Sequence, residues 1–382
     1  MTRAQTTDRA PHGNWIAGAD PRGINGTPRP VPPFSRRRNA PRGALVAGGA
    51  GFLGSHLCTR LIEEGYRVYC MDNFHTGLAD NLEHLSDEPR FVMMDHDIRT
   101  PAPAFNDVVE IYNLACPASP PHYQETPIGT VTTSVLGTLN LLELANRLGA
   151  RFLLTSTSEI YGDPEVHPQP ESYRGSVNPI GPRACYDESK RMAETLCYDF
   201  VRQHELDVRV ARVFNTYGPR MRLDDGRIIS NLVGQALRGD PMTIYGTGRQ
   251  TRSFCYVSDL VDGLVRLMRR RERVPGPVNL GNPEEFTILE VAELIGRLTG
   301  RDVTLTHSPL PEDDPRRRRP DISLAIRLLD WQPSVPLRDG LLSTIDWFAP
   351  LVGRPAEPVV SGRSGATDMA PGRAAVVASP ER

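Results

Sequence analysis

The stretch Ala44-Leu-Val-Ala-Gly-Gly-Ala-Gly-Phe-Leu-Gly54 decides the fold of this chain of 382 residues. The apolar run at its start predicts a short buried strand over 44–47, and an amphipathic pattern predicts a helix over 55–64. Between them lie glycines at 48, 49, 51 and 54, which allow a tight turn and a close approach of backbone amides to a phosphate. Strand, glycine-rich turn and helix in this order favour a dinucleotide-binding unit, although a lone glycine pattern is weak evidence.

The rest of the chain continues this alternation of strands and helices. Further strands are predicted over 67–71, 91–93, 108–114, 152–156 and 208–213, with long helices over 127–148 and 187–203. Regular alternation predicts an α/β fold with a doubly wound parallel sheet of the Rossmann type. Beyond about 215 the pattern loosens, and helices predicted over 229–237, 257–270 and 288–298 suggest a smaller lobe over the carboxyl ends of the strands.

The domain boundaries follow from composition. Residues 1–41 and 353–382 are rich in Pro, Gly and Arg without apolar periodicity, and we predict them to be disordered extensions. The catalytic unit is then 42–350. Its cofactor-binding part is mainly 42–215, and its substrate-binding C-terminal lobe is mainly 216–350, with the chain crossing back between the two.

Asp72 supports the dinucleotide interpretation. It ends the second predicted strand 18 residues after Gly54, close to the separation of about 20 that is typical of such sites. A carboxylate here accepts hydrogen bonds from the adenosine ribose hydroxyls and repels a 2′-phosphate, so NAD is favoured over NADP. The simpler alternative is an exposed aspartate at the end of a strand.

The bulk composition excludes several classes of partner. The formal net charge is −2, so no general attraction to nucleic acid or to an anionic membrane surface is expected. No apolar run is expected to approach the roughly 20 residues that span a bilayer, and the N-terminus lacks the apolar core of a signal peptide. The six cysteines are scattered and are expected to be buried thiols in the reducing cytoplasm, and no metal-ligand spacing is present.

Tyr186 and Lys190 stand four residues apart in a predicted helix, so their side chains lie on one face. An ammonium group beside a phenol stabilises the phenolate and lowers its pKa, which makes tyrosine a usable base near neutrality. The spacing alone is weak evidence, but Lys190 is the only lysine among 44 basic residues. An arginine cannot be deprotonated, and its broad guanidinium would fit poorly beside a phenol and a nicotinamide ribose.

Several segments together resemble the extended short-chain dehydrogenase/reductase family, and within it the UDP-glucuronate decarboxylases. They are ACPASPPHY (115–123), LLTSTSEIYGDPEVHPQ (153–169), NPIGPRACYDESKR (178–191), ARVFNTYGPRM (211–221), GTGRQTRSFCYVSDLV (246–261), NLGNPEEFTILE (279–290) and RRPDIS (318–323). The resemblance covers roughly 42–350 and leaves out the two tails.

The resemblance implies conversion of UDP-glucuronate to UDP-xylose and CO2 with a retained NAD. Tyr186 takes the C4 hydroxyl proton as the hydride leaves C4, the resulting 4-keto acid loses CO2, and the hydride returns to C4. The implied catalytic residues are Thr157, Ser158, Glu159, Tyr186, Lys190 and Arg252. The implied substrate-binding residues are Glu159 and Arg252 near C5 and its carboxylate, Asn215 and Arg318 at the diphosphate, and Tyr245 near the uridine. The implied cofactor-binding residues are Gly48, Gly51, Phe52, Leu53, Gly54, Asp72, Asn73, Phe74, Thr76, Gly77, Asp97, Ile98, Leu114, Thr133, Thr155, Tyr186 and Lys190.

The residues also leave room for near relatives and for a different class of protein. Ser158 stands where sugar-nucleotide 4,6-dehydratases carry an aspartic acid that protonates the leaving hydroxyl, so dehydration is disfavoured. Release of a UDP-4-keto-pentose with NADH, nucleotide-sugar epimerisation and a regulatory NAD(H)-binding role stay open. Relatives pair through the helices near 127–148 and 187–203, which implies a homodimer.

Four features carry open interpretations. Ser134 replaces the asparagine usual in the family, which could weaken a hydrogen bond near the catalytic helix, and Asn113 replaces a common histidine. The basic run 316–319 is expected to be a solvated run with one diphosphate-binding arginine rather than a nucleic-acid site. His122 and Tyr123 either close over the substrate or belong to ordinary loop packing.

Overall fold

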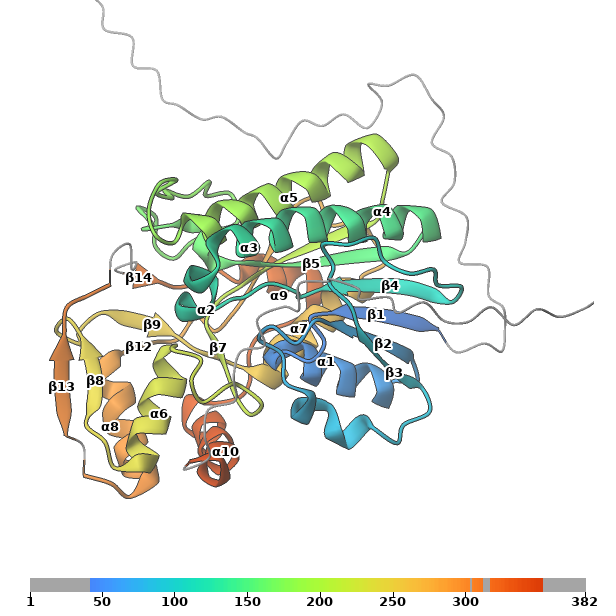
Figure 1. Ribbon diagram of the computed structural model, residues 1–382. Helices are drawn as coiled ribbons and strands as arrows, with labels where there is room; N and C mark the ends of the chain where they lie inside the picture. The colour runs from blue at the N-terminus through green and yellow to red at the C-terminus, as the bar shows by residue number, and fades with distance from the viewer. Residues whose placement is uncertain (1–41, 303, 312–316, 353–382) are drawn as a thin grey trace, which may run out of the picture. The chain divides into compact units, whose positions relative to one another are not determined.

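The structure is a computed structural model, and it describes residues 42–352 except 303 and 312–316. The disorder predicted for 1–41 and 353–382 therefore lies outside the described residues. The core of the described part is a seven-stranded sheet in which every pairing is parallel. The expected α/β doubly wound sheet is confirmed (Figure 1).

The strand order in this sheet is β11-β6-β5-β4-β1-β2-β3. The order reverses between β1 and β4, and a ligand of an open α/β sheet binds outside the carboxyl ends of the strands at such a reversal. The strands are β1 (Gly43–Ala47), β2 (Arg67–Asp72), β3 (Phe91–Asp95), β4 (Val108–Asn113), β5 (Arg151–Thr157), β6 (Val208–Val213) and β11 (Val278–Leu280).

Helices cover both faces of this sheet (Figure 1). On one face, α1 (Phe52–Glu63), α7 (Val257–Arg269) and α9 (Ser323–Leu329) bury residues such as Leu57, Leu264 and Leu329. On the other face, α4 (Thr138–Leu148) and α5 (Ala184–His204) bury Leu141 and Ala193. Each helix places one apolar stripe against the sheet, which is why the 3.6-residue pattern in the sequence predicted it.

The helix predicted over 127–148 has an irregular middle. It consists of α3 (Pro127–Thr132), a π-helical turn η2 (Thr133–Gly137) and α4. Such π turns inside helices are frequent at functional sites. Pro127–Leu148 is also long and apolar enough to cross a membrane, so the expectation that no segment approaches this length was wrong. Part of the apolar character is explained by packing, because 44% of the window is buried inside the molecule.

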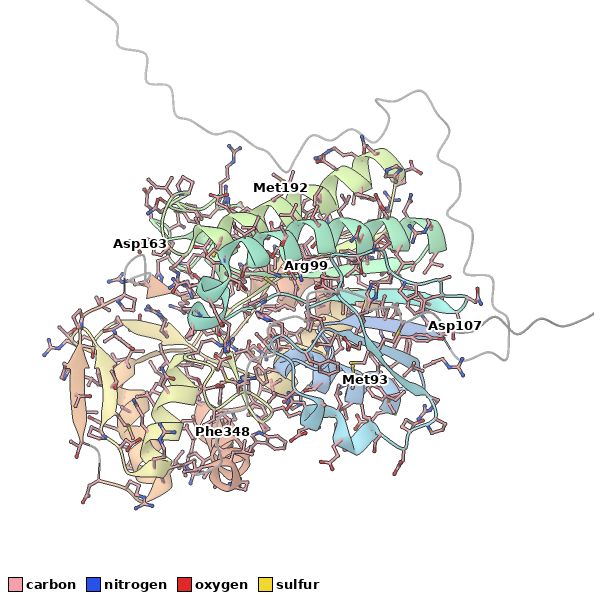
Figure 2. All side chains as sticks on the ribbon, viewed as in Figure 1. Met93, Arg99, Asp107, Asp163, Met192 and Phe348 are labelled. Atoms are coloured by element: carbon pink, nitrogen blue, oxygen red, sulfur yellow. The ribbon has the colours of Figure 1, made fainter. Side chains whose placement is uncertain are left out.

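A smaller lobe follows the sixth strand. Its core lies between α6 (Ile228–Arg238), α8 (Ile288–Thr299) and α10 (Leu337–Phe348), beside the two-stranded sheet of β8 (Met242–Tyr245) and β13 (Leu305–Ser308). Figure 2 labels Phe348, a buried member of this core. This part of the chain also forms a three-stranded sheet with the order β12-β9-β14. Its strands are β12 (Glu285–Thr287), β9 (Thr251–Ser253) and β14 (Arg317–Arg318).

Several elements had no sequence prediction, mainly because they are short or lack a clear period. They are the helices α2 (Pro120–Glu125), α9 and α10, the short strands β7 (Thr216–Tyr217), β8, β9, β10 (Cys255–Tyr256), β12, β13 and β14, and the 3₁₀-helical segments η1 (Ala79–Leu85), η3 (Ser158–Tyr161) and η4 (Ala349–Leu351). Strand β11 was missed too. Its three residues extend the main sheet beside β6, and so the chain returns from the lobe to the sheet.

Candidate active site

A cavity of about 550 Å³ lies along the carboxyl ends of the main strands and reaches into the smaller lobe. Residues that follow β1, β2, β4, β5 and β6 all line it, as the reversal of strand order predicts. The lobe contributes Tyr245, Arg252 and Arg318 to the opposite wall.

The cavity collects nearly all of the residues that the sequence singled out. One exception is Phe74, which packs against the hydrophobic core under the sheet instead. Its backbone amide still contributes, because it donates a hydrogen bond of 2.9 Å to the Asp72 carboxylate. The predicted residues that line the cavity are Gly48, Gly51, Phe52, Leu53, Gly54, Asp72, Asn73, Thr76, Gly77, Asp97, Ile98, Leu114, Thr133, Thr155, Thr157, Ser158, Glu159, Tyr186, Lys190, Asn215, Tyr245, Arg252 and Arg318.

The glycine turn has the geometry of a pyrophosphate cradle. Gly48 has a φ of 77°, where a side chain would be strained. A Cβ on Gly54 would lie 2.0 Å from the carbonyl oxygen of Gly48, so helix α1 can pack this closely on the turn only with glycine there. At Gly51, the N-cap of α1, a Cβ would meet just one atom within 4 Å, and the space before the helix N-terminus stays open for a phosphate.

Asp72 is held where a ribose would lie. Its two oxygens accept hydrogen bonds from the amides of Ala50 and Phe74, both at 2.9 Å. Burial raises the pKa of Asp72, while these amide hydrogen bonds oppose the shift. Each carboxylate oxygen keeps a further lone pair for a hydroxyl donor. The glycine turn and this carboxylate together fit NAD.

Asn73 and Asp97 form the next part of the same wall. The Asn73 amide donates to Asp97 at 3.2 Å, and Arg99 donates to the same carboxylate. Burial favours the neutral form of Asp97, but Arg99 outweighs this effect and the pKa lies below its ordinary value. An ionised, fixed carboxylate at this point can accept hydrogen bonds from an adenine amino group.

Tyr186 and Lys190 are both buried on α5 and face the cavity. The Lys190 Nζ lies 5.9 Å from the centre of the Tyr186 ring. Burial nevertheless raises the pKa of Tyr186 well above its ordinary value, with a hydrogen bond to Thr157 acting in the opposite direction. The lowering expected from Lys190 therefore does not dominate in the protein alone, because desolvation of the phenolate is the larger effect.

Lys190 is oriented by the strand ends rather than by another side chain. Its Nζ donates to the Thr155 carbonyl at 3.0 Å, and the Thr155 hydroxyl donates to the Asn113 carbonyl at 2.8 Å. The Asn113 side chain in turn donates to Thr138 at 3.0 Å. Asn113 therefore links β4 to the helix after the π turn.

Ser134 lies in the π turn and is buried. Its Oγ lies 3.1 Å from the Sγ of Cys116, within the distance of a hydrogen bond that involves sulfur. The shorter side chain thus keeps a partner, although a thiol is a weak one. Cys116 and Cys185 are half-buried, so the expectation of buried cysteines holds for the other four.

Glu159 is the centre of a buried cluster of charges. Arg318 Nη1 donates to Glu159 Oε1 and Arg318 Nη2 donates to Oε2, both at 2.5 Å. Arg183 also donates to Oε2, at 2.7 Å. Burial alone would raise the pKa of Glu159, but Arg318 and Arg183 outweigh it and hold the pKa below its ordinary value. The carboxylate is therefore ionised, and a bidentate arginine fixes its plane.

This cluster adds a contact that the sequence did not predict, and two sequence expectations about the same residues stay predictions. Glu159 was expected to work with Arg252, and Arg318 was expected at the diphosphate. In the structure Arg318 grips Glu159 through both of its terminal nitrogens. Arg252 is paired with Arg318 across neighbouring strands and donates to the Thr251 carbonyl at 2.9 Å. Strand pairing, which brings 318 beside 252, was not visible in the sequence.

Arg183 was not assigned a site role from the sequence, and for Tyr123 a role over the substrate was left open beside ordinary loop packing; both line the cavity. The rings of Tyr123 and Tyr186 stack in parallel, with centres 5.0 Å apart and planes 5° apart. The Tyr123 hydroxyl is buried and has no hydrogen-bond partner among the described residues. Two sequence features could have indicated these residues: Arg183 lies one helical turn before Tyr186, and Tyr123 closely follows two prolines. Neither feature shows how far these side chains lie from Glu159 or from the Tyr186 ring.

The remaining predicted residues stand at the far end of the cavity. Asn215 follows β6, and Tyr245 ends β8 with 40% of its surface exposed. Arg227 also lines the cavity and is held by Asp225 through two hydrogen bonds. An amide, an arginine and an exposed aromatic ring that line one cavity can bind a diphosphate and a flat base.

Comparison with known proteins identifies the family of this chain and the enzymes that it is similar to. Residues 44–281, more than half of the chain, match the NAD dependent epimerase/dehydratase family. The chain is 55% identical over 305 residues to UDP-glucuronic acid decarboxylase 1 of Danio rerio, covering 80% of this chain and 72% of that protein. It is 53% identical over 321 residues to UDP-glucuronic acid decarboxylase 5 of Arabidopsis thaliana, covering 82% and 93%.

Solved structures agree with the fold and the cofactor. The UDP-glucuronic acid 4-epimerase of Bacillus cereus, in complex with UDP-glucuronic acid and NAD, is similar with a TM-score of 0.73 and 29% identity. The similarity covers 81% of this chain and 99% of the epimerase.

Proposed function

This chain belongs to the NAD dependent epimerase/dehydratase family, and from that premise we propose that it converts UDP-glucuronate to UDP-xylose and CO2. The observation that carries the proposal is an ionised Glu159, fixed by Arg318 and Arg183, in the same cavity as Tyr186 and Lys190. The curated relatives at 53–57% identity are UDP-glucuronic acid decarboxylases, which supports the same reaction.

The reaction begins at the sugar C4. NAD, held by the glycine turn and by Asp72, would supply the hydride acceptor for C4 and, once reduced, the hydride donor. Tyr186 takes the C4 hydroxyl proton, assisted by the Thr157 hydroxyl, which accepts from the Glu159 amide at 3.2 Å and can donate its own proton. The pKa of Tyr186 is raised by burial even with Lys190 in place, so the phenol holds a proton in the protein alone. The added positive charge of oxidised NAD would be needed to favour the phenolate.

Decarboxylation then needs little help from an acid. The C4 ketone is β to the carboxylate, so the C5–C6 bond breaks, CO2 leaves and the electron pair moves into an enolate on C4 and C5. A proton from water is added at C5, the hydride returns to the C4 carbon, and Tyr186 returns its proton to the oxygen on C4. Glu159, Arg318 and Arg183 form a preorganised charged environment that holds the sugar in place without reorganising during the reaction. Ser158 is buried beside them and cannot act as the acid that a dehydration requires.

The test is to incubate the purified protein with UDP-glucuronate, with and without added NAD+, and to follow mass and reduced-nicotinamide absorbance. A UDP-pentose formed without net NADH supports the closed cycle. A UDP-4-keto-pentose with stoichiometric NADH would replace it with release of the intermediate. An unchanged mass would overturn decarboxylation, and conversion to an isomer of equal mass would point to epimerisation.

We also propose that the protein is a homodimer, paired through α3, η2, α4 and α5. Apolar side chains on these helices are exposed, most clearly Ile128 at 79%, Met192 at 48% and Leu136 at 47%. Figure 2 shows Met192 on α5, on the side away from the sheet. Light scattering of the protein and of Met192→Glu tests this, because a charge in the interface should give a monomer.

For the location, we propose the cytoplasm. The support is that all six cysteines are free thiols, as expected in a reducing compartment. A fluorescent fusion observed in the source cell would test the proposal, and a signal confined to a membrane would contradict it.

A further inference from the structure

The small sheet β12-β9-β14 presents two arginines to the cavity from one face. Arg252 on β9 pairs directly with Arg318 on β14, and both line the cavity. Successive side chains of a strand point to opposite faces. The neighbours Thr251 and Arg319 are therefore expected on the far face, where they are available to contacts that do not involve a ligand.

Glu285 on β12 contacts both of these neighbours. The Thr251 hydroxyl donates to Glu285 Oε1 at 2.6 Å, and Arg319 Nη1 lies 3.6 Å from Oε2. His167 Nε2 lies 3.2 Å from the same Oε2. One carboxylate thus touches the residue before Arg252, the residue after Arg318, and the loop that continues from Glu159.

A second contact fixes the backbone at the same point. The Gln169 side chain accepts from the Arg319 amide at 2.8 Å, and the Gln169 amide donates to the Arg319 carbonyl at 2.9 Å. Gln169 is fully buried, whereas the Glu285 side chain is 20% exposed. Gln169 therefore belongs to the packed interior, while Glu285 can be changed with less risk to folding.

We propose that Glu285 is a positioning residue for the decarboxylation, which holds β9 and β14 in register so that Arg252 and Arg318 stay aimed at Glu159 and the substrate carboxylate. The inference rests on the proposed function for its substrate. The physical reason is geometric: when β9 or β14 shifts, the guanidinium at the end of its long arginine side chain is displaced as well. A misplacement of about 1 Å in a reacting group can lower a rate by about a hundredfold.

The experiment compares Glu285→Ala and Glu285→Gln with the control Glu284→Ala. Glu284 is the exposed neighbour, so its change removes a charge of the same sign next to the same strand. The turnover rate per NAD-loaded subunit should fall by about tenfold to a hundredfold in Glu285→Ala, should stay unchanged in Glu284→Ala, and should be partly restored in Glu285→Gln. The amide of glutamine still accepts from Thr251 but cannot pair with Arg319.

The contacts of the carboxylate with the two arginine-bearing strands can be separated from its contact with His167. Thr251→Val and Arg319→Met each remove one strand contact, and together they should reproduce most of the loss in Glu285→Ala. A purely structural role predicts a different result, namely a lower melting temperature and less bound NAD, with an unchanged rate per loaded subunit. That result, or equal rates in Glu285→Ala and wild type, would overturn the proposal.

A binding measurement separates this inference from the proposed function. Calorimetry should show that the wild-type protein binds UDP-glucuronate more tightly than UDP-glucose, and that Glu285→Ala loses this preference while it retains NAD. A wild-type protein that shows the preference but forms no UDP-pentose would contradict the proposed function alone. A preference that survives in Glu285→Ala contradicts the role of Glu285.

Discussion

The nucleotide end and the charged end of the cavity are built in different ways. At the nucleotide end, the glycine turn and Asp72 lie within one β1–α1–β2 unit, and backbone amides make the decisive contacts. At the charged end, Glu159 and Arg318 are 159 residues apart and meet through side chains. The first region is defined by local conformation, whereas the second depends on strand pairing in another lobe. A short motif can therefore identify the first region but not the second.

The largest effect on the turnover rate is expected at Tyr186, which lies in the cavity with both regions. Tyr186→Phe removes the proton acceptor at C4, and turnover should fall by about a hundredfold to ten-thousandfold. Bound NAD, measured after denaturation, should stay the same, because the nucleotide end is untouched. A variant that keeps most of its turnover would place the base elsewhere and would favour a binding role for the fold.

Arg318→Ala tests the charged end directly. Loss of the bidentate partner should lower the rate by about a hundredfold to a thousandfold, as for loss of a preorganised donor. It also leaves the largely buried Glu159 with Arg183 as its hydrogen-bonded arginine, so the free energy of unfolding should fall by about 3–5 kcal/mol. Arg318→Lys should restore little, because lysine cannot bind a carboxylate through two parallel hydrogen bonds.

The same cluster makes a prediction for pH. The pKa of Glu159 is lower in the folded protein than in the unfolded chain, so its contribution to stability is present above the unfolded value of about 4.3 and is lost as the pH falls through the folded value. Denaturation curves between neutral pH and pH 3 should show less acid sensitivity in Glu159→Gln than in the wild-type protein. Equal slopes would mean that other carboxylates dominate acid unfolding.

Gly54→Ala tests the nucleotide end. The new Cβ would lie 2.0 Å from the Gly48 carbonyl oxygen, and backbone atoms on both sides limit relaxation. We expect a loss of stability of about 1–3 kcal/mol, as for overpacking, together with weaker NAD binding. Gly65→Ala is the control for a glycine with open space around it, although its positive φ of 84° adds a strain of its own. Normal NAD binding in Gly54→Ala would show that the turn tolerates a different path.

The smallest expected effect is that of Tyr123→Phe. This change removes an unpaired hydroxyl and keeps the ring that stacks on Tyr186. If the hydroxyl binds the sugar nucleotide, KM should rise by the worth of one hydrogen bond, about twofold to tenfold, with NAD content unchanged. A variant identical to wild type would limit Tyr123 to stacking, and Tyr123→Leu would then show the larger loss.

The sequence by itself determined the main sheet apart from its edge strand β11, the dinucleotide turn, Asp72 and the Tyr186–Lys190 pair. These features depend on residues that are near one another in the chain, and their periods and spacings translate directly into geometry. The helix over 127–148 was located correctly, but its π turn was not foreseen, because one extra residue in a turn leaves no mark on the apolar pattern.

Only the tertiary structure decided which arginine meets Glu159, and that Tyr123 stacks on Tyr186. Only it could show, too, that burial raises the pKa of Tyr186 despite the nearby Lys190. Contacts across β9 and β14 join residues that the chain separates widely, and desolvation depends on everything that surrounds a group. The sequence specifies the contacts between strands and the desolvation of a group only through the complete fold, and no local sequence pattern reveals them.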